Sequence, residues 1–325
     1  MSKHNPRTAS IASRPESADW LLVEEVLAGL RATPKRLSSA YLYDQRGSEL
    51  FDAICALPEY YLTRTETAIL ASHAAEIAAC IGKRALLLEP GSGSSRKTRL
   101  LLDALPDLAA YVPVDISRSH LLEAARALQA AYPRLQVLPV CADFTLGFAL
   151  PPPPRPPARV VVFFPGSTLG NFDPPQAIRL LELMRHTAGR RGGLLLGIDL
   201  AKDPVILERA YNDAAGVTAA FNMNLLARLN RELAADFDLG GFRHEAVWVR
   251  AQSRIEMRLV SLREQTAHLA GAPVEFAAGE RLITEHCHKY TAESFASQAR
   301  TAGWMPRRAW TDPRGYFSVQ YLETV

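Results

Sequence analysis

Five apolar stretches, most of them followed by a segment with helical spacing, restrict the fold of this chain more than any other feature. Each stretch is apolar almost throughout, with no alternation of polar residues. Strands buried on both faces have this composition, and their alternation with helices is typical of a parallel sheet covered by helices on both sides. The predicted strands are residues 85–89, 109–117, 135–144, 160–164 and 192–200.

A different pattern interrupts this alternation after the fifth strand. Residues 204–236 have helical spacing almost throughout, and residues 244–290 read as antiparallel strands. A helix at 292–302 and two strands within 305–323 then resume the first pattern. We therefore expect a doubly wound α/β fold whose sheet reaches seven strands, with an inserted α+β segment. Three helices predicted before the sheet, at 19–30, 48–57 and 65–81, could join that insertion.

The loop after the first strand, "EPGSGSSRKT" from Glu89 to Thr98, nearly matches two phosphate-binding motifs. A P-loop needs glycine immediately before its Lys-Ser/Thr pair, and a dinucleotide-binding loop needs its third glycine at the same place. Arg96 occupies that position and breaks both patterns. The loop therefore favours a different kind of ligand.

Acidic residues end three successive predicted strands: Glu89, Asp115 and Asp143. In open α/β sheets the carboxyl ends of the strands meet around the ligand. Three carboxylates would repel a phosphate, but they suit a cationic ligand with a ribose and an adenine, which S-adenosylmethionine provides. Each acid could instead cap the helix that follows it. Lys97 is expected against the carboxylate of the cofactor, with an ordinary surface lysine as the alternative.

Composition limits the compartment and the partners. The 37 basic and 34 acidic residues are well mixed, no run of like charges points to nucleic acid, and no apolar stretch is long enough to cross a membrane. Four cysteines without CxxC spacing indicate a reduced, cytoplasmic chain. We expect a monomer that acts on a small molecule, with a flexible N-terminus over residues 1–17.

Motifs along nearly the whole chain resemble those of the L-histidine Nα-methyltransferases, which make trimethylhistidine (hercynine) in ergothioneine biosynthesis. They include "YLYDQRGSELFDAICALPEYYLTRTE", "EPGSGSSRKTRLLLDAL", "FPGSTLGN", "LLLGIDLAKD" and "FAAGERLITEHCHKY". The resemblance implies a Rossmann-like domain at 66–200 and 292–325 that binds S-adenosylmethionine. It also implies a substrate-binding domain built from 18–65 and 201–291.

The resemblance assigns two groups of site residues. The cofactor-binding positions are Gly91, Lys97, Asp115, Asp143 and Phe144. The positions around the amino acid are Tyr43, Tyr60, Gly166, Asn171, Tyr211, Glu285 and Cys287. On chemical grounds, we expect the hydroxyls of Tyr43 and Tyr60, a backbone carbonyl near Gly166 and water to pass out the proton of the amine, with Tyr43 and Gly166 as the catalytic positions. Asn171 and Tyr211 are implied for the substrate carboxylate and Glu285 for the imidazole.

The substrate assignment leaves alternatives open. The family usually has serine where this chain has Cys287, and a thiol is a weaker hydrogen-bonding group. An aromatic amino acid is therefore a second candidate substrate, and a nucleotide-binding module is a third possibility. The tyrosines could also be ordinary packing residues.

The sequence "HCH" from His286 to His288 invites a metal-site interpretation. Strand alternation places His286 and His288 on one face of the strand and Cys287, with Glu285, on the other. The residues of "HCH" therefore do not form one set of metal ligands. We expect no metal.

Overall fold

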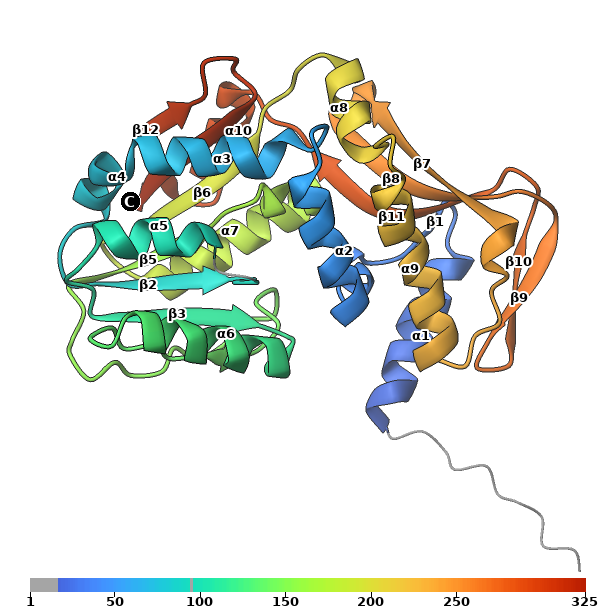
Figure 1. The fold of residues 1–325 in the computed structure, drawn as a ribbon, viewed down its shortest axis with the longest axis horizontal. Coiled ribbons are helices and arrows are strands. Elements are labelled where there is room, and N and C mark those ends of the chain that lie inside the picture. Colours follow the sequence, from blue (N-terminus) through green and yellow to red (C-terminus); the bar gives the residue numbers. More distant parts are fainter. Residues whose placement is uncertain (1–16, 94–95) are drawn as a thin grey trace, which may run out of the picture.

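A sheet of seven strands forms one side of the molecule in the computed structural model, which describes residues 17–93 and 96–325 (Figure 1). Its strands are β2 (Ala85–Pro90), β3 (Ala110–Asp115), β4 (Val140–Cys141), β5 (Arg159–Phe164), β6 (Gly193–Asp199), β12 (Trp304–Thr311) and β13 (Phe317–Thr324). The order is β12-β13-β6-β5-β2-β3-β4, and β13 is the strand that runs opposite to all the others in this sheet. The strand order reverses between β2 and β5, and ligands of such sheets bind at this point.

Helices cover both faces of this large sheet, because its strands are apolar on both sides. Within β2, Leu87 belongs to one buried cluster while Leu86 and Leu88 belong to another, as the two-residue period of a strand requires. The helices associated with the sheet are α3 (Tyr61–Ser72), α4 (Ala74–Ile81), α5 (Arg96–Ala104), α6 (Arg118–Ala131), α7 (Pro174–Ala188) and α10 (Ala292–Thr301).

A second, smaller sheet lies beside the large one (Figure 1) and has the order β1-β11-β8-β7. Its strand β1 comes from the N-terminal part and pairs in parallel with β11, so two distant segments share this sheet. The elements on this side are α1 (Ser17–Arg31), β1 (Lys35–Arg36), α2 (Gln45–Ala56), α8 (Pro204–Tyr211), α9 (Val217–Glu232), β7 (Phe242–Val249), β8 (Arg254–Ser261), the hairpin β9 (Gln265–Leu269) with β10 (Ala272–Phe276), and β11 (Arg281–His288).

The inserted segment leaves the large sheet and returns to it at one point. Leu200 and Tyr290 form a parallel β-bridge. The Tyr290 N–H donates to the Asp199 carbonyl at 3.0 Å, and the Ala201 N–H donates to the Tyr290 carbonyl at 2.8 Å. The two ends of the insertion are therefore neighbours in space, although about ninety residues separate them in the chain.

The predicted α/β fold with a seven-stranded sheet and an inserted α+β segment is confirmed, but two predicted elements are wrong in extent. The helix predicted at 65–81 is two helices that meet at His73; both bury apolar residues in the same core, so the spacing could not reveal the break. The strand predicted at 135–144 is reduced to β4. Pro139 precedes it and has no N–H to donate to a neighbouring strand.

The domain boundary expected between residues 65 and 66 falls inside α3, which runs through it and packs against β13. We propose that the boundary lies between α2 and α3 instead. The flexible N-terminus expected over residues 1–17 lies outside the described residues, apart from Ser17 at the start of α1.

Candidate active site

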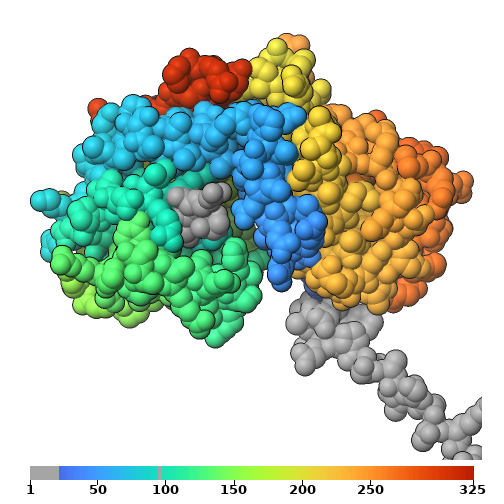
Figure 2. All heavy atoms as spheres, in the orientation of Figure 1, coloured from blue at the N-terminus to red at the C-terminus, as the bar shows by residue number. Residues whose placement is uncertain are grey.

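One cavity of about 1400 Å³ collects every site residue that the sequence indicated. Figure 2 shows the surface hollowed between the N-terminal helices, in blue, and the side of the large sheet that is coloured cyan to green. The predicted residues that line the cavity are Tyr43, Tyr60, Gly91, Lys97, Asp115, Asp143, Phe144, Gly166, Asn171, Tyr211, Glu285 and Cys287. Residues from both sheets therefore meet in one place, whereas their individual roles stay predictions.

Asp115 and Asp143 line the cavity and also hold the turns that follow their strands. Asp115 Oδ1 accepts from the Ser117 N–H at 2.9 Å, and Asp143 Oδ1 accepts from the Thr145 N–H at 2.8 Å. The capping alternative and the ligand-binding prediction are thus compatible, because each turn uses Oδ1. In the part of the chain that the structure describes, no group bonds Oδ2 of either acid. These oxygens can accept hydrogen bonds from a ligand.

Glu89, the third acid at a strand end, has a different environment. It is only 2% exposed, and the hydroxyls of Thr98 and Tyr111 both donate to its Oε2. Burial raises its pKa to about 7, although the two hydroxyls and the charge of Lys97 act in the opposite direction. Glu89 therefore shapes the inner wall of the cavity and contributes less free charge than the sequence suggested.

Lys97 has a protein partner that the sequence analysis missed. Its ammonium forms an ion pair with Glu66 of α3, a carboxylate that is 1% exposed and that also accepts from the Gly166 N–H, at 3.0 and 2.9 Å to its two oxygens. Gly197 makes room for it, since a Cβ there would lie 2.0 Å from Glu66 Oε1. A signal was present, because Glu66 falls on the apolar face of α3 beside Leu62.

The loop after β2 lets its backbone approach the cavity. Gly91 has φ +67°, a conformation that favours glycine, and its N–H donates to the Val114 carbonyl at 2.8 Å. The ring of Phe144 lies close by, 3.5 Å from the position of a Cβ on Gly91. A flat apolar ring beside this loop suits the adenine of S-adenosylmethionine.

Aromatic rings line the part of the cavity nearest the small sheet. The rings of Tyr43, Phe51, Tyr60 and Tyr211 form a series of edge-to-face contacts with centroid separations of 5.6, 6.1 and 6.0 Å. Burial raises the pKa of all three tyrosines well above the ordinary value. Their hydroxyls are therefore neutral donors and acceptors at physiological pH, and none of them is a preformed base.

Glu285 joins two other predicted residues directly. The Asn171 amide donates to Oε1 at 3.1 Å, and the Cys287 thiol donates to Oε2 at 3.3 Å. Burial raises the pKa of Glu285 to about 7, while the bond from Cys287 and the charge of Lys289 lower it. The resemblance implied Asn171 for the substrate carboxylate, but without substrate its amide orients Glu285.

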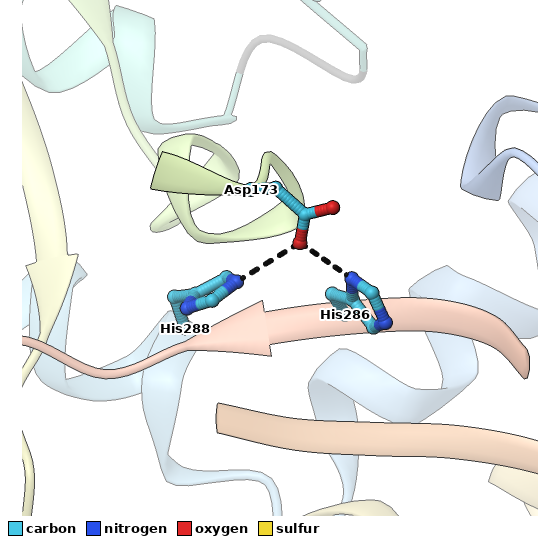
Figure 3. A group of neighbouring side chains, drawn as sticks. All are labelled: Asp173, His286 and His288. Atoms are coloured by element: carbon cyan, nitrogen blue, oxygen red, sulfur yellow. Dashed lines mark hydrogen bonds and ion pairs between the residues drawn. The ribbon is translucent and has the colours of Figure 1, made fainter. Parts of the chain in front are cut away.

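The two histidines of β11 meet Asp173 (Figure 3). Glu285 has other partners, Asn171 and Cys287, as the predicted alternation of the strand requires. His286 Nδ1 lies 2.8 Å and His288 Nε2 lies 3.4 Å from Asp173 Oδ1. The three groups are close enough together to be considered as metal ligands. This proximity was not predicted, because Asp173 lies more than a hundred residues earlier in the chain.

Two arginines argue against a metal ion at this cluster. Arg36 approaches Asp173 Oδ2 at 3.1 Å, and Arg254 approaches Oδ1 at 3.2 Å. A divalent cation on the same carboxylate would lie beside two fixed positive charges. Burial lowers the pKa of both histidines, helped by Arg254, so they are neutral donors to Asp173. We interpret the cluster as a group of hydrogen bonds and ion pairs that holds β11 against the start of α7.

Comparison with known proteins shows the family to which this chain is related. Residues 22–324 match the model of a family described as histidine-specific, SAM-dependent methyltransferases. The chain is 45% identical to histidine N-alpha-methyltransferase of Mycolicibacterium smegmatis, over 94% of this chain and 95% of the relative. It is 42% identical to the protein of that name from Mycobacterium tuberculosis, over 92% and 93%. Ergothioneine biosynthesis protein 1 of Neurospora crassa is 30% identical, over 86% of this chain and 32% of the relative.

Proposed function

Because the chain belongs to the family of SAM-dependent, histidine-specific methyltransferases, we propose that it transfers three methyl groups to the α-amine of L-histidine. The product would be Nα,Nα,Nα-trimethylhistidine. The observation that carries this proposal is Glu285, a buried acceptor for an imidazole N–H, which lines the same cavity as the acids at the ends of β2 and β3. This one cavity can hold both reactants.

The residues at the strand ends fit the cofactor. Oδ2 of Asp115 would accept from the ribose hydroxyls, and Asp143 with Phe144 would receive the adenine. Lys97 would neutralise the carboxylate of the methionine part while Glu66 holds the lysine in place. When bound, the cofactor supplies a methyl group on a sulfonium, which is an electrophile that needs no acid to activate its leaving group.

The chain contributes alignment and a dry site more than acid–base catalysis. A substrate held at both ends, by its carboxylate and by its ring, presents the amine in one place for each of three transfers. The amine has to lose a proton before each transfer. The neutral hydroxyls of Tyr43 and Tyr60 would relay that proton towards water, with Gly166 of the adjoining loop as a further contact.

Mass spectrometry of histidine incubated with the protein and S-adenosylmethionine tests the proposal. We expect mono-, di- and trimethylated histidine, with the trimethylated form at completion. Competition among free amino acids tests the alternative that Cys287 has changed the substrate to an aromatic amino acid.

Calorimetry should detect binding of S-adenosylhomocysteine and not of ATP, because Arg96 breaks the phosphate-binding pattern. Binding of ATP alone would favour the nucleotide-binding alternative.

Asn171 and Tyr211 should affect histidine and not the cofactor. Asn171→Ala removes a donor from Glu285 and from the substrate, and Tyr211→Phe removes a phenol from the wall of the cavity. We expect the KM for histidine to rise about tenfold in each variant, the cost of one or two hydrogen bonds. The affinity for S-adenosylhomocysteine, measured by calorimetry, should stay within about threefold, or roughly 0.7 kcal/mol. Parallel loss of both affinities would make these residues structural.

We propose that the enzyme works as a monomer in the cytoplasm and that its partner is a small molecule. Within the described residues, no helix is long and apolar enough to cross a membrane. None of the four cysteines forms a disulfide bond, and a chain without disulfides is compatible with a reducing compartment. Size-exclusion chromatography with light scattering would test the oligomeric state.

A further inference from the structure

A buried group of charges lies between the large sheet and β11, next to the cavity. Its centre is Asp199, at the end of β6, which is fully buried. Lys202 approaches Asp199 Oδ1 at 2.5 Å, Lys289 approaches Oδ2 at 2.8 Å, and the Tyr61 hydroxyl donates to both oxygens at 2.8 Å. Neither the motifs nor the resemblance assigned a role to this group.

The group has two ammonium groups and one carboxylate. Two further carboxylates act on it from its edge: Asp312 acts on Lys202, and Glu285, whose raised pKa reduces its charge, interacts with Lys289. Two ammonium groups share the single carboxylate of Asp199, and both are buried, with side chains 6% (Lys202) and 1% (Lys289) exposed. A buried charge without a full partner is costly, so a buried cation that shares one carboxylate beside a cavity favours an anionic ligand there. Burial also lowers the pKa of Lys202 to about 8, and the charge of Lys289 acts in the same direction.

Of the two lysines, only Lys289 faces the cavity. Lys289 and Tyr211 both line it, whereas Lys202 and Tyr61 do not. Lys289 continues the face of β11 that carries Glu285 and Cys287, since it follows them at the two-residue period of a strand. The charge of Lys289 is therefore directed at the space in which we place the substrate.

Lys289 also fixes the direction of the Tyr211 hydroxyl. The ammonium donates to the phenolic oxygen at 2.9 Å and lies 4.7 Å from the centroid of the ring. A phenol has one hydrogen to donate, and with its oxygen accepting from Lys289 that hydrogen must point elsewhere. The neighbouring thiol of Cys287 is only a weak acceptor. A carboxylate in the cavity is a much better partner for this hydrogen.

We propose that Lys289 determines specificity by making the enzyme require an α-carboxylate on its substrate. The inference rests on the proposed function. Lys289 would act in two ways: its charge attracts the carboxylate, and its hydrogen bond turns the Tyr211 hydroxyl towards the carboxylate. Histamine has the same ring and a primary amine but no carboxylate, so it separates this requirement from recognition of the ring.

Lys202 provides a matched control within the same group. Like Lys289 it pairs with Asp199, donates to a tyrosine hydroxyl (Tyr61, 2.6 Å) and lies over that ring, 4.5 Å from the centroid. Lys202→Met therefore removes the same kind of buried interactions without changing the wall of the cavity. A lysine that only stabilises the fold would give the same phenotype at either position.

The test compares Lys289→Met with Lys202→Met on histidine and histamine. We expect Lys289→Met to raise the KM for histidine about 10- to 30-fold, as for loss of a charged hydrogen bond, with little change for histamine. The preference for histidine over histamine should fall by the same factor. Lys202→Met should keep the preference of the wild type, and both variants should bind S-adenosylhomocysteine normally.

Several outcomes would overturn the inference. They are an unchanged preference in folded Lys289→Met, or equal changes of preference in the two lysine variants. If Lys289→Met does not fold, the pair Lys289→Met with Asp199→Asn removes both charges and should still lose the preference. A wild-type enzyme that leaves histidine unmethylated would refute the proposed function, whereas one that methylates it without needing Lys289 would refute only this inference.

Discussion

Asp115→Ala should lower the affinity for S-adenosylhomocysteine by about 2 to 4 kcal/mol, the cost of losing charge-assisted hydrogen bonds to both ribose hydroxyls. This is roughly a 30- to 1,000-fold increase in Kd. The effect should be large because Asp115 is held in place by the Ser117 N–H before any ligand arrives, so its free oxygen needs no ordering on binding. Calorimetry at fixed ionic strength would measure it.

Asp115→Asn separates binding from folding in this experiment. The amide oxygen can still accept from the Ser117 N–H, so the turn after β3 is kept while the charge is lost. We expect an intermediate Kd and an unchanged thermal midpoint for this variant. If folded Asp115→Ala binds S-adenosylhomocysteine as tightly as the wild type, the ribose lies elsewhere.

Glu285→Ala should abolish the preference for histidine over phenylalanine and tryptophan. A carboxylate that accepts an imidazole N–H should account for about 1.5 to 3 kcal/mol of the discrimination, or roughly 10- to 150-fold in kcat/KM. Cys287→Ser should leave the preference unchanged or improve histidine binding, because a hydroxyl replaces a weak thiol donor to Glu285. Competition among free amino acids for methylation measures both variants. A wild type that prefers tryptophan or tyrosine, or a switch of substrate in Cys287→Ser, would contradict this assignment.

The same carboxyl should leave a signature in the pH dependence of stability. Its folded pKa of about 7 lies above the ordinary value of 4.5. Between these values the folded state keeps a proton that the unfolded state has released, so the free energy of unfolding falls as the pH rises. Glu285→Gln removes this contribution and should gain stability over the wild type between pH 5 and 8, as measured by urea unfolding. If the free energies of unfolding of Glu285→Gln and the wild type differ by the same amount at pH 5 and at pH 8, Glu285 is charged over the whole range.

The sequence was sufficient for the parts of the site that follow from strand ends. Asp115 and Asp143 line one cavity because parallel strands place their carboxyl ends at the same edge, and the apolar runs located those ends. Alternation along β11 likewise predicted that Glu285 would share partners with Cys287 and not with His286 and His288, which contact Asp173 instead. Both rules are local, so they needed no knowledge of which segments pack together.

Contacts between distant segments could not be predicted in this way. Glu66 pairs with Lys97, and Asp173 meets His286, only because the fold brings different elements together. Lys289 looks like an ordinary polar residue after a strand until Asp199 is placed opposite it. A buried charge on an apolar face, such as Glu66, was the one available warning, since such residues are rarely buried without a partner.

The β-bridge between Leu200 and Tyr290 has a consequence for how new specificities can arise. Because the insertion begins and ends at one place, its length and sequence can change without displacing the strands that surround the cofactor. Chimaeras that exchange residues 201–290 between relatives should therefore keep the cofactor-binding site of one parent. The N-terminal part contributes Tyr43 and Tyr60 to the cavity and β1 to the small sheet. It would therefore have to be exchanged together with the insertion. Acceptor choice in this architecture therefore depends on two separate segments that have to come from one parent, and on their fit to Asn171 of the large sheet domain.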